Sequence, residues 1–427
     1  MDDKFGSSLP WAEPSWYTGI PSPYYDEGHA KFRNFIREWM QKTISNADPP
    51  SSESETFLKF AELGLLLPIG AGAKIPAEFA RHWKLPGVKA EDWDGFYDLI
   101  MWDEMYRDIW ALPSGISGVV VGLPPLLRFG NGYIKREIVP EILSGKKRIC
   151  FAVTEPDTGS DLKNIVTTAE KSADGRHFVV NGEKKWITNG GNADYLTTLV
   201  RTGGPGINGL SVLLIPKSSQ VRTRPMELSP DGQHFTHFVT FDDALVPAEN
   251  LIGAEGGGFP IIVDNINHER LLASYQALSL SRTAIRQTVN WVCKREAFGT
   301  PLVQQPVIRW KLAQMGRQVE SLQAWIEQNL YANKHLGSGA NKRLGGTTAL
   351  LKAQAGMTIK FVGDECQKLF GGLGMTKTGL GRDIESIVRR APLLIVPGGA
   401  EDVLLDFGAR EALKQAGVKV IPWSPKL

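Results

Sequence analysis

The sequence predicts an α+β multidomain protein in which a β domain lies between two helical domains. Two changes in the spacing of apolar residues along the 427-residue chain support this prediction. The spacing is mostly helical up to residue 147, alternates as in β-strands over 148–253, and is helical again over 254–427. A chain of this length also exceeds what one simple core accommodates, so two or three domains are expected.

The N-terminal part begins with residues 1–25, which are rich in proline, serine and aromatic residues and predict an irregular extension. Residues 26–147 are predicted to form the N-terminal helical domain. In this domain HAKFRNFIREWMQK places its apolar residues on one face, and SESETFLKFAELGLL begins like a capped helix. The stretch 68–95 is interrupted by proline and glycine and predicts an inserted loop.

The middle part, residues 148–253, consists of short alternating stretches with β-branched residues, separated by Asn-Gly, Gly-Gly and proline turns. Such a pattern is typical of an all-β domain. Within this part, Asn181-Gly182 is a dipeptide typical of a tight turn between two strands. A β-hairpin is therefore predicted there.

The C-terminal part, residues 254–427, resumes the helical period after a glycine-rich stretch. Apolar residues recur every three or four positions in two long series, which are Leu312, Met315, Val319, Leu322, Ile326 and Leu330, and then Leu351, Ala355, Thr358, Val362, Cys366 and Leu369. Long amphipathic helices with this spacing predict an antiparallel helical bundle.

The composition argues against several classes of function. The formal net charge is +2 and the charges are mixed along the chain, which argues against nucleic acid or an anionic membrane as a partner. No apolar run has the length needed to span a membrane. Cys150, Cys293 and Cys366 lie far apart, so neither a disulfide framework nor a metal site is expected.

The two ends of the chain bear on localisation. The start, MDDKFGSSLP, is acidic and lacks an apolar core, so neither a secretory signal nor a transit peptide is expected. The end, Pro425-Lys426-Leu427, resembles a peroxisomal Ser-Lys-Leu signal and fits a chance ending equally well. An intracellular location is therefore expected, peroxisomal or cytosolic rather than mitochondrial.

Two short stretches of the β domain contain residues suited to binding a ligand. CFAVTEPDTGSD (150–161) is a strand followed by a turn whose hydroxyl and N–H groups suit a phosphate or a polar ring edge. In KKWITNGG (184–191), Trp186 offers a flat apolar surface and Thr188 a hydroxyl beside it. Taken singly, an ordinary strand end explains each stretch more simply.

Two further stretches come from the C-terminal part. In KREAFGTPLVQQPVIR (294–309), Arg295 and Phe298 are expected on the last turn of a helix that Gly299 ends, where the guanidinium suits a pyrophosphate. KLFGGLGMT (368–376) has glycines that let a ligand approach the backbone closely. Taken singly, a surface arginine, a core phenylalanine and a glycine turn between helices explain these stretches more simply.

Together, and in this order, the four stretches resemble one family. The chain is similar to the acyl-CoA dehydrogenase flavoproteins from about residue 30 to 415, most specifically in VTEPDTGSD, WITNGG, REAFG and LFGGLG. The resemblance implies an N-terminal helical domain, a central β-barrel-like domain and a C-terminal four-helix bundle. It also implies FAD bound noncovalently, an acyl-CoA substrate and a role in fatty acid or amino acid catabolism.

By analogy with the family, two sets of residues would contact FAD. The first set would line the isoalloxazine, with Thr188 near flavin N5, and reach the pyrophosphate through Ser160; it consists of Phe151, Val153, Thr154, Ser160, Trp186 and Thr188. The second set would reach the FAD of a neighbouring subunit and consists of Arg295, Phe298, Gly371 and Gly372. Asp402 also stands at a position that contacts FAD in relatives. Contacts between subunits imply a homodimer or a homotetramer built as a dimer of dimers.

The family reaction removes a proton from the carbon next to a thioester carbonyl, while a hydride leaves the next carbon for the flavin. It needs a positioned base, usually a carboxylate, and donors aimed at the carbonyl oxygen. Many members carry this base in a Tyr-Glu-Gly-Thr stretch that follows Arg-x-Ala. When Arg389 and Ala391 are aligned with that motif, Gly398 falls at the glutamate position, so the usual base is missing.

A minority of the family, isovaleryl-CoA dehydrogenase among them, carries the glutamate on a bundle helix instead. In NINHERLLAS (265–274), Glu269 falls at that alternative position and Arg270 at the family's arginine for the CoA arm. The resemblance thus implies Glu269 as the catalytic base, with Gly398 offering its backbone N–H to the thioester oxygen. A solvated surface glutamate is the plain alternative, because acids on helices usually face water.

Some residues depart from the family pattern. Pro306 and Lys368 stand where glutamine is common. The usual Arg-x-Ser-x-Thr near the substrate is replaced by a stretch that contains His234, Phe235 and His237. These departures leave the substrate open, and the expected insertion at 68–95 is a candidate cover for the acyl pocket.

Three functions therefore stay open. The first is an acyl-CoA dehydrogenase that makes a trans-2-enoyl-CoA and passes electrons to an electron-transfer flavoprotein. The second is a flavin oxidase or monooxygenase of the same fold, which would use O₂ on a small molecule without CoA. The third is a catalytically inactive flavoprotein that binds a partner or nucleic acid, although the near-neutral charge argues against nucleic acid.

Overall fold

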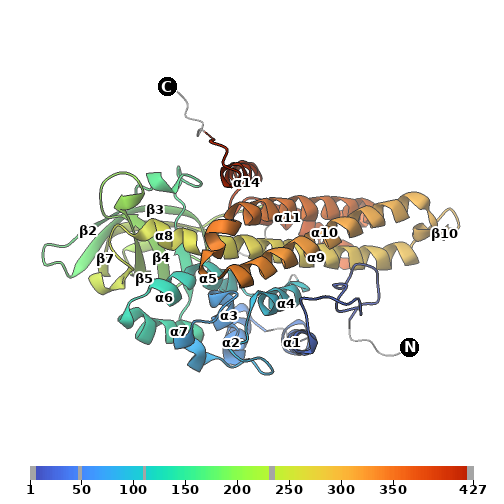
Figure 1. The fold of residues 1–427 in the computed structure, drawn as a ribbon, viewed down its shortest axis with the longest axis horizontal. Helices are drawn as coiled ribbons and strands as arrows, with labels where there is room; N and C mark the ends of the chain where they lie inside the picture. Colours follow the sequence, from blue (N-terminus) through green and yellow to red (C-terminus); the bar gives the residue numbers. More distant parts are fainter. Residues whose placement is uncertain (1–5, 47–50, 109–111, 230–235, 421–427) are drawn as a thin grey trace. The chain divides into compact units, whose positions relative to one another are not determined.

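The computed structural model describes residues 6–46, 51–108, 112–229 and 236–420, and its elements follow in the predicted order helical, β, helical (Figure 1). The predicted fold class is confirmed. The chain forms two compact units, which are residues 1–37, 99–109 and 267–427 (unit 1) and residues 38–98 and 110–266 (unit 2). His234, Phe235 and the C-terminal Pro425-Lys426-Leu427 lie outside the described residues.

The α-helices that precede the first strand are α1 (Glu27–Met40), α2 (Glu53–Leu63), α3 (Leu66–Ala71), α4 (Gly95–Tyr106), α5 (Ser114–Gly122), α6 (Pro124–Phe129) and α7 (Val139–Leu143). The predicted cap of α2 is present. Ser52 accepts from the N–H of Glu55, and the Glu55 carboxylate accepts from the N–H of Ser52, which forms a capping box. In the part of the chain that the structure describes, no helix combines the length and apolarity of a membrane span.

Residues 68–95 are not a plain loop, contrary to the prediction. The stretch contains the second half of the buried helix α3 and a 3-10 helix, Ala77–His82. Trp93 also donates its indole N–H to the carbonyl of Gly72 at 2.9 Å. Gly72 follows α3 and Pro76 precedes the 3-10 helix, so these residues mark the ends of short helices.

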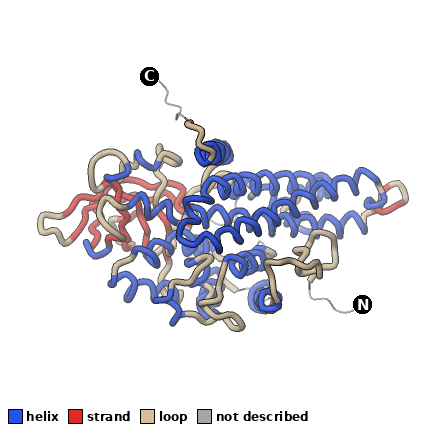
Figure 2. The backbone as a smooth tube through the Cα atoms, viewed as in Figure 1, coloured by secondary structure: helices blue, strands red, loops and turns tan. Residues whose placement is uncertain are grey.

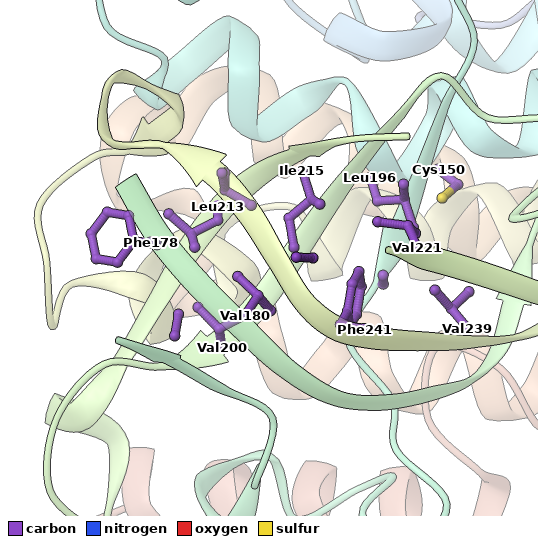
Figure 3. Close-up of a cluster of buried hydrophobic side chains, with 14 of the residues drawn as sticks. Cys150, Phe178, Val180, Leu196, Val200, Leu213, Ile215, Val221, Val239 and Phe241 are labelled. Atoms are coloured by element: carbon purple, nitrogen blue, oxygen red, sulfur yellow. The ribbon is translucent and has the colours of Figure 1, made fainter. Parts of the chain in front are cut away.

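The β domain contains β1 (Ile149–Ala152), β2 (Thr168–Lys171), β3 (His177–Thr188), β4 (Tyr195–Arg201), β5 (Leu210–Pro216), β6 (Val221–Pro225), β7 (Thr236–Pro247) and β8 (Leu251–Ile252). These strands form one sheet in the order β6-β7-β3-β2-β4-β5-β8, and β1 pairs with β4 in parallel. Figure 3 shows the buried apolar core of this domain, to which β3, β4, β5 and β7 contribute Phe178, Leu196, Leu213 and Phe241. The alternation read from the sequence thus places one side of each strand in this core.

Helix α5 packs closely on β1 through two glycines. A Cβ on Gly118 would lie 2.1 Å from the carbonyl oxygen of Ile149, and one on Gly122 would lie 2.8 Å from that of Cys150. The carbonyl of Gly122 also accepts from the hydroxyl of Thr197 on β4 at 2.8 Å. Small residues are therefore required on this face of α5, and they fix the position of β1.

Asn181-Gly182 does not form the predicted hairpin. Both residues lie inside β3, where the pairing with β7 shifts register between Val180 and Gly182. Gly182 has a φ of +141°, and a Cβ there would lie 2.7 Å from Oγ1 of Thr167. Glycine is thus required for a β-bulge and a close approach rather than for a turn. The chain turns between β2 and β3 at residues 172–176 instead.

The later helices are α8 (Gly258–Asp264), α9 (Ile266–Lys294), α10 (Pro306–Leu336), α11 (Ala340–Phe370), α12 (Arg382–Arg390), α13 (Pro392–Ile395) and α14 (Glu401–Gln415). The three long helices α9, α10 and α11 run side by side in unit 1 (Figure 1). Both predicted apolar series are buried along α10 and α11. The helical bundle expected from the spacing is therefore present.

Arg295 and Phe298 do not lie on the last turn of a helix, contrary to the prediction. Helix α9 ends at Lys294, and a short hairpin of β9 (Glu296–Ala297) and β10 (Thr300–Pro301) follows at the end of the bundle (Figure 2). Phe298 and Gly299 have φ values of +56° and +78°. A tight hairpin turn needs positive φ at both central residues, so this pair forms the turn rather than a helix cap.

The N-terminal extension is anchored in unit 1 by buried charges. The carboxylate of Glu13 is buried and forms ion pairs with Arg33, Arg37 and Arg107. Arg282 of α9 donates to the main-chain oxygen of Glu13 at 2.9 Å. Buried charges are stable only with such partners, so this part of the extension is an integral part of the unit.

Candidate active site

The two candidate ligand-binding stretches of the β domain meet at the end of β1. Lys184 of β3 is buried and donates from its ammonium to the carbonyl of Val153 at 3.0 Å. The N–H of Lys185 donates to the carbonyl of Thr154 at 2.9 Å. The residues that follow β1 are therefore held beside the last residues of β3.

Glu155 completes this junction, although the sequence prediction did not include it. Its buried carboxylate lies 2.9 Å from the Lys184 ammonium and accepts from the N–H groups of Val166 and Thr167. Burial raises the pKa of Glu155, but the Lys184 charge and the hydrogen bonds outweigh burial, so that the pKa is lowered. Burial lowers the pKa of Lys184 to about 8, and Glu155 offsets part of this effect.

The side chains predicted to line a flavin are mostly half-buried. Trp186 is 49% exposed and has a φ of +66° where β3 shifts register against β7. Phe151, Thr154 and Thr188 are half-buried, whereas Val153 is buried and Ser160 is exposed like Trp186. An indole with hydroxyl groups on neighbouring segments offers a flat apolar surface with polar edges, which suits a flavin ring.

The first turn of α9, in unit 1, contains Glu269 and Arg270. Glu269 is half-buried, and the buried Arg270 donates its Nε–H to the carbonyl oxygen of Gly398 at 3.3 Å. The Arg270 guanidinium also lies 5.4 Å from the ring centre of Phe407 on α14. Burial lowers the pKa of Arg270, and the Glu269 charge offsets part of this effect. The first turn of α9 and the Gly398 loop, residues 395–400, are thus brought together.

The Gly398 loop is shaped by two glycines. Gly398 and Gly399 have φ values of +71° and +113°. Within residues 6–46, 51–108, 112–229 and 236–420, the N–H of Gly398 finds no acceptor, and space is open where its Cβ would be. The N–H is therefore available to a ligand. Glu401 and Asp402 follow in the first turn of α14, where Glu401 is half-buried and Asp402 is exposed.

Lys352 of α11 also belongs to this region, and the sequence prediction missed it. Its side chain is buried, and its ammonium donates to the carbonyl oxygens of Ile395 at 2.6 Å and Gly399 at 2.7 Å. Burial lowers the pKa of Lys352 to about 8. The spacing contained a signal, because Lys352 falls on the buried side of α11, three residues after Ala349 and three before Ala355.

The second predicted FAD set lies at the other end of the bundle. Arg295 and Phe298 follow the end of α9, which lies on the order of 40 Å along the helix from Glu269. Gly371 and Gly372 are exposed just after α11, near that same end of α9, because Trp291 of α9 stacks on Phe370. This set therefore cannot join Glu269 in one site of the same chain.

Comparison with known proteins gives the family. Two protein-family models match the chain. The acyl-CoA dehydrogenase C-terminal domain matches residues 256–413, and the acyl-CoA dehydrogenase middle domain matches residues 150–244. Acyl-CoA dehydrogenase apdG of Emericella nidulans is 40% identical over 425 residues, which cover 96% of this chain and 96% of that protein. The chain belongs to the acyl-CoA dehydrogenase family.

Other acyl-CoA dehydrogenases agree with this assignment. One from Bacillus subtilis is 31% identical over 394 residues, covering 87% of this chain and 94% of its own length. The crystal structure of one from Geobacillus kaustophilus shares the fold, with a TM-score of 0.78, 24% identity and coverage of 92% of this chain and 100% of its own. The protein is thus an acyl-CoA dehydrogenase, an oxidoreductase that acts on CH–CH donors. Of the three functions that the sequence left open, acyl-CoA dehydrogenase activity is therefore the correct one.

FAD is the cofactor of acyl-CoA dehydrogenases, and the residues present here fit it. Trp186 and its half-buried neighbours suit the flavin ring, as described above. Gly371 and Gly372 leave open space where a side chain would otherwise stand. Arg295 is exposed and forms no ion pair with any residue that the structure describes, so its guanidinium is available to a pyrophosphate.

Proposed function

We propose that this acyl-CoA dehydrogenase uses Glu269 as its base and makes a trans-2-enoyl-CoA. One observation carries the proposal: Arg270, the residue after Glu269, donates to the carbonyl of Gly398 at 3.3 Å. This contact supports a shared site for the first turn of α9 and the loop that lacks the usual family glutamate. The base would then be placed as in the isovaleryl-CoA dehydrogenase type.

In the proposed reaction, the Glu269 carboxylate takes the proton from the carbon next to the thioester carbonyl. The electron pair of that C–H bond forms the new C=C bond, and the next carbon loses a hydride. FAD supplies the hydride acceptor when it is bound. The acid form of Glu269 holds the proton until product leaves, and water exchange then restores the carboxylate.

Gly398 would stabilise the charge that develops on the thioester oxygen. Its N–H has no acceptor within the described part of the chain, and a preorganised N–H donor costs no reorganisation during the reaction. Arg270 has two roles in this proposal. It contacts the CoA arm, as the arginine at this position does in the family, and it donates to the Gly398 carbonyl. Holding the carbonyl also fixes the peptide plane that follows it and thus the position of the loop.

The second FAD set supports a functional homodimer or homotetramer. Phe298 is 97% exposed at the tip of the hairpin, which is unusual for an isolated large apolar side chain. In the proposal, Arg295, Phe298, Gly371 and Gly372 contact the FAD of a neighbouring copy. Phe151, Val153, Thr154, Ser160, Trp186 and Thr188 contact the FAD of their own chain, and Asp402 contacts FAD as its position does in relatives. An electron-transfer flavoprotein receives the electrons.

Anaerobic mixing of the holoenzyme with short, long and branched acyl-CoAs tests the proposal. Loss of flavin absorbance reports reduction. The Glu269→Gln variant is expected to reduce its flavin about 100- to 10,000-fold more slowly, because it lacks a general base. Glu401→Gln, which removes the acid that follows the Gly398 loop in the first turn of α14, is the comparison and should keep most of the rate. Reduction that survives Glu269→Gln and is lost in Glu401→Gln would move the base to α14.

A further inference from the structure

Lys352 is one of the most completely buried charged side chains of unit 1, at 1% exposure, and no carboxylate forms an ion pair with it among the described residues. Its ammonium instead donates to two main-chain carbonyls, those of Ile395 and Gly399. These carbonyls stand on either side of Gly398. Burial of a lysine is costly without a strong reason, since charged groups lose their hydration. The carbonyls of the Gly398 loop are the partners that offset part of this cost.

The loop needs such a donor. Helix α13 ends at Ile395, Pro397 has no N–H group, and Gly398 and Gly399 adopt positive φ. The loop therefore cannot continue the helical pattern that would satisfy its own carbonyls. The bonds that these carbonyls accept are partly buried, and a partly buried carbonyl that loses its donor costs free energy, so the loop would rearrange without Lys352.

Arg270 of α9 holds the loop from another side. Its Nε–H donates to the carbonyl of Gly398, between the two carbonyls that Lys352 holds. Three hydrogen bonds from two helices, to the carbonyls of Ile395, Gly398 and Gly399, thus hold residues 395–399. The charged groups that act on Lys352 are Arg270 from α9 and Glu401 from α14, which oppose each other.

We propose that Lys352 is a positioning residue of the reaction: by binding the carbonyls of Ile395 and Gly399, it holds the Gly398 N–H where the thioester oxygen will lie. The inference rests on the proposed function, because it gives Gly398 the role of oxyanion donor. Lys352 itself touches neither substrate nor reacting atoms in this proposal. Its effect passes entirely through the conformation of the loop.

The charge of Lys352 makes this contact dependent on pH. A charged donor forms a hydrogen bond roughly twice as strong as a neutral one. Because burial lowers the pKa of Lys352 to about 8, the ammonium loses its charge at mildly alkaline pH. The rate of flavin reduction should therefore fall above about pH 8.

The test uses the holoenzyme and three variants. Lys352→Met keeps the length of the side chain and removes the donor, and Lys352→Arg keeps a charged donor that does not titrate in this range. Lys360→Met is the matched control, since Lys360 lies two turns further along α11, is exposed and pairs with Asp364. Two measurements are made: hydrogen exchange of peptides that span 393–404, and anaerobic flavin reduction at increasing acyl-CoA concentration from pH 6 to 10.

Lys352→Met should speed exchange over 395–404 and lower the limiting rate of reduction about 10- to 100-fold, while the acyl-CoA concentration at half-maximal rate changes little. The alkaline fall in rate should be absent in both Lys352 variants, and Lys352→Arg should recover most of the rate. Lys360→Met should behave as the unaltered enzyme. If Lys352→Met folds poorly, Lys352→Arg and the pH profile of the unaltered enzyme still test the proposal.

Two results would overturn it. Unchanged exchange in Lys352→Met would show that the loop does not depend on the ammonium, and faster exchange with an unchanged rate would show that the loop position does not serve the reaction. The Glu269→Gln variant distinguishes a failure of the proposed function from a failure of the inference about Lys352. If that variant reduces flavin normally, the base assignment fails, whereas the exchange result for Lys352 stands by itself.

Discussion

The ammonium of Lys184 lies 2.9 Å from the carboxylate of Glu155, and both side chains are buried in the β domain. The pair joins the segment after β1 to the end of β3, and each of these segments contains a stretch by which the family is recognised. Removing either partner would leave the other charge buried without a counter-charge, so the geometry of both stretches depends in part on this pair.

This dependence predicts a strong coupling between the two residues. Glu155→Gln should destabilise the fold by about 3–5 kcal/mol, since it leaves the Lys184 charge buried without a counter-charge. Lys184→Met should cost less, because Glu155 keeps the N–H donors of Val166 and Thr167. The double variant should lose less free energy of unfolding than the two single variants lose together. Denaturant unfolding of all four proteins measures the coupling, and additive losses would contradict it.

A second prediction concerns stability at alkaline pH. The pKa of Lys352 is lowered to about 8 in the folded protein, so the unfolded chain binds the proton more tightly above that pH. The free energy of unfolding therefore gains a contribution as pH rises through 8, which reaches about 1 kcal/mol between pH 7 and 9. The stability of Lys352→Met relative to the unaltered protein should fall by this amount over the same range.

Denaturant unfolding at pH 7, 8 and 9 tests whether the free energy of unfolding changes with pH in this direction. The buried thiols of Cys150 and Cys366 have their pKa raised to about 12, and they act in the opposite direction above pH 9. The difference between variant and unaltered protein removes their effect, because both proteins contain the two thiols. A difference that is constant with pH would contradict the prediction.

A third prediction concerns acid and the N-terminal extension. Burial raises the pKa of Glu13, but Arg107, Arg33 and Arg37 outweigh burial and lower it to about 2. Glu13 therefore contributes stability that is fully present above its unfolded pKa of about 4.3 and is lost as pH falls towards 2. Glu13→Gln should lower stability at pH 7 by a few kcal/mol, roughly 3–5, and flatten its fall below pH 4.5.

Thermal unfolding from pH 3 to 7 measures this effect. Glu27→Gln is the control, because Glu27 forms an exposed ion pair with Lys31 and such pairs contribute little. Equal behaviour of the two variants would show that the Glu13 cluster does not anchor the extension.

The close packing of α5 on β1 gives a fourth prediction. Gly118→Ala would place a methyl group 2.1 Å from the carbonyl oxygen of Ile149, so α5 must move away from β1. A loss of about 1–3 kcal/mol or more is expected from such overpacking. Gly204→Ala in the same unit meets no atom within 4 Å and should be nearly neutral. Denaturant unfolding compares the two, and a neutral Gly118→Ala would contradict this account of the packing.

The exposed hairpin gives a fifth prediction. Phe298→Ser should leave the stability of the protomer nearly unchanged, because the side chain is 97% exposed. It should weaken subunit association and the retention of FAD, if the neighbouring copy covers the hairpin. Val166→Ser, which alters another exposed apolar residue, at 73% exposure, should change neither. Sedimentation velocity and the release of FAD on dilution measure both effects, and unchanged assembly in Phe298→Ser would remove the hairpin from the interface.

Periodicity in the sequence determined the architecture. The order of helical and β parts was predicted from the apolar series of α10 and α11 and from the alternation in β3, β4, β5 and β7. Burial of one face gives each element a characteristic spacing of apolar residues, and this spacing is visible within a short stretch of sequence. The capping box of α2 was also readable, since its residues lie within one turn. The site residues predicted by resemblance, such as Glu269 and Trp186, depend on motifs that are local in the sequence.

Only the tertiary structure decided the features that depend on distant partners. Asn181-Gly182 became a bulge because β7 pairs across it. Phe298-Gly299 has no distant partner, but only the structure showed that α9 ends at Lys294 and that a hairpin turn follows. The Glu155–Lys184 and Lys352–Gly399 contacts join residues 29 and 47 positions apart. A buried charge looks like any solvated one in a single sequence. Its function becomes visible when folding removes the water around it and places specific partners beside it, as with Lys352 and the carbonyls of Ile395 and Gly399.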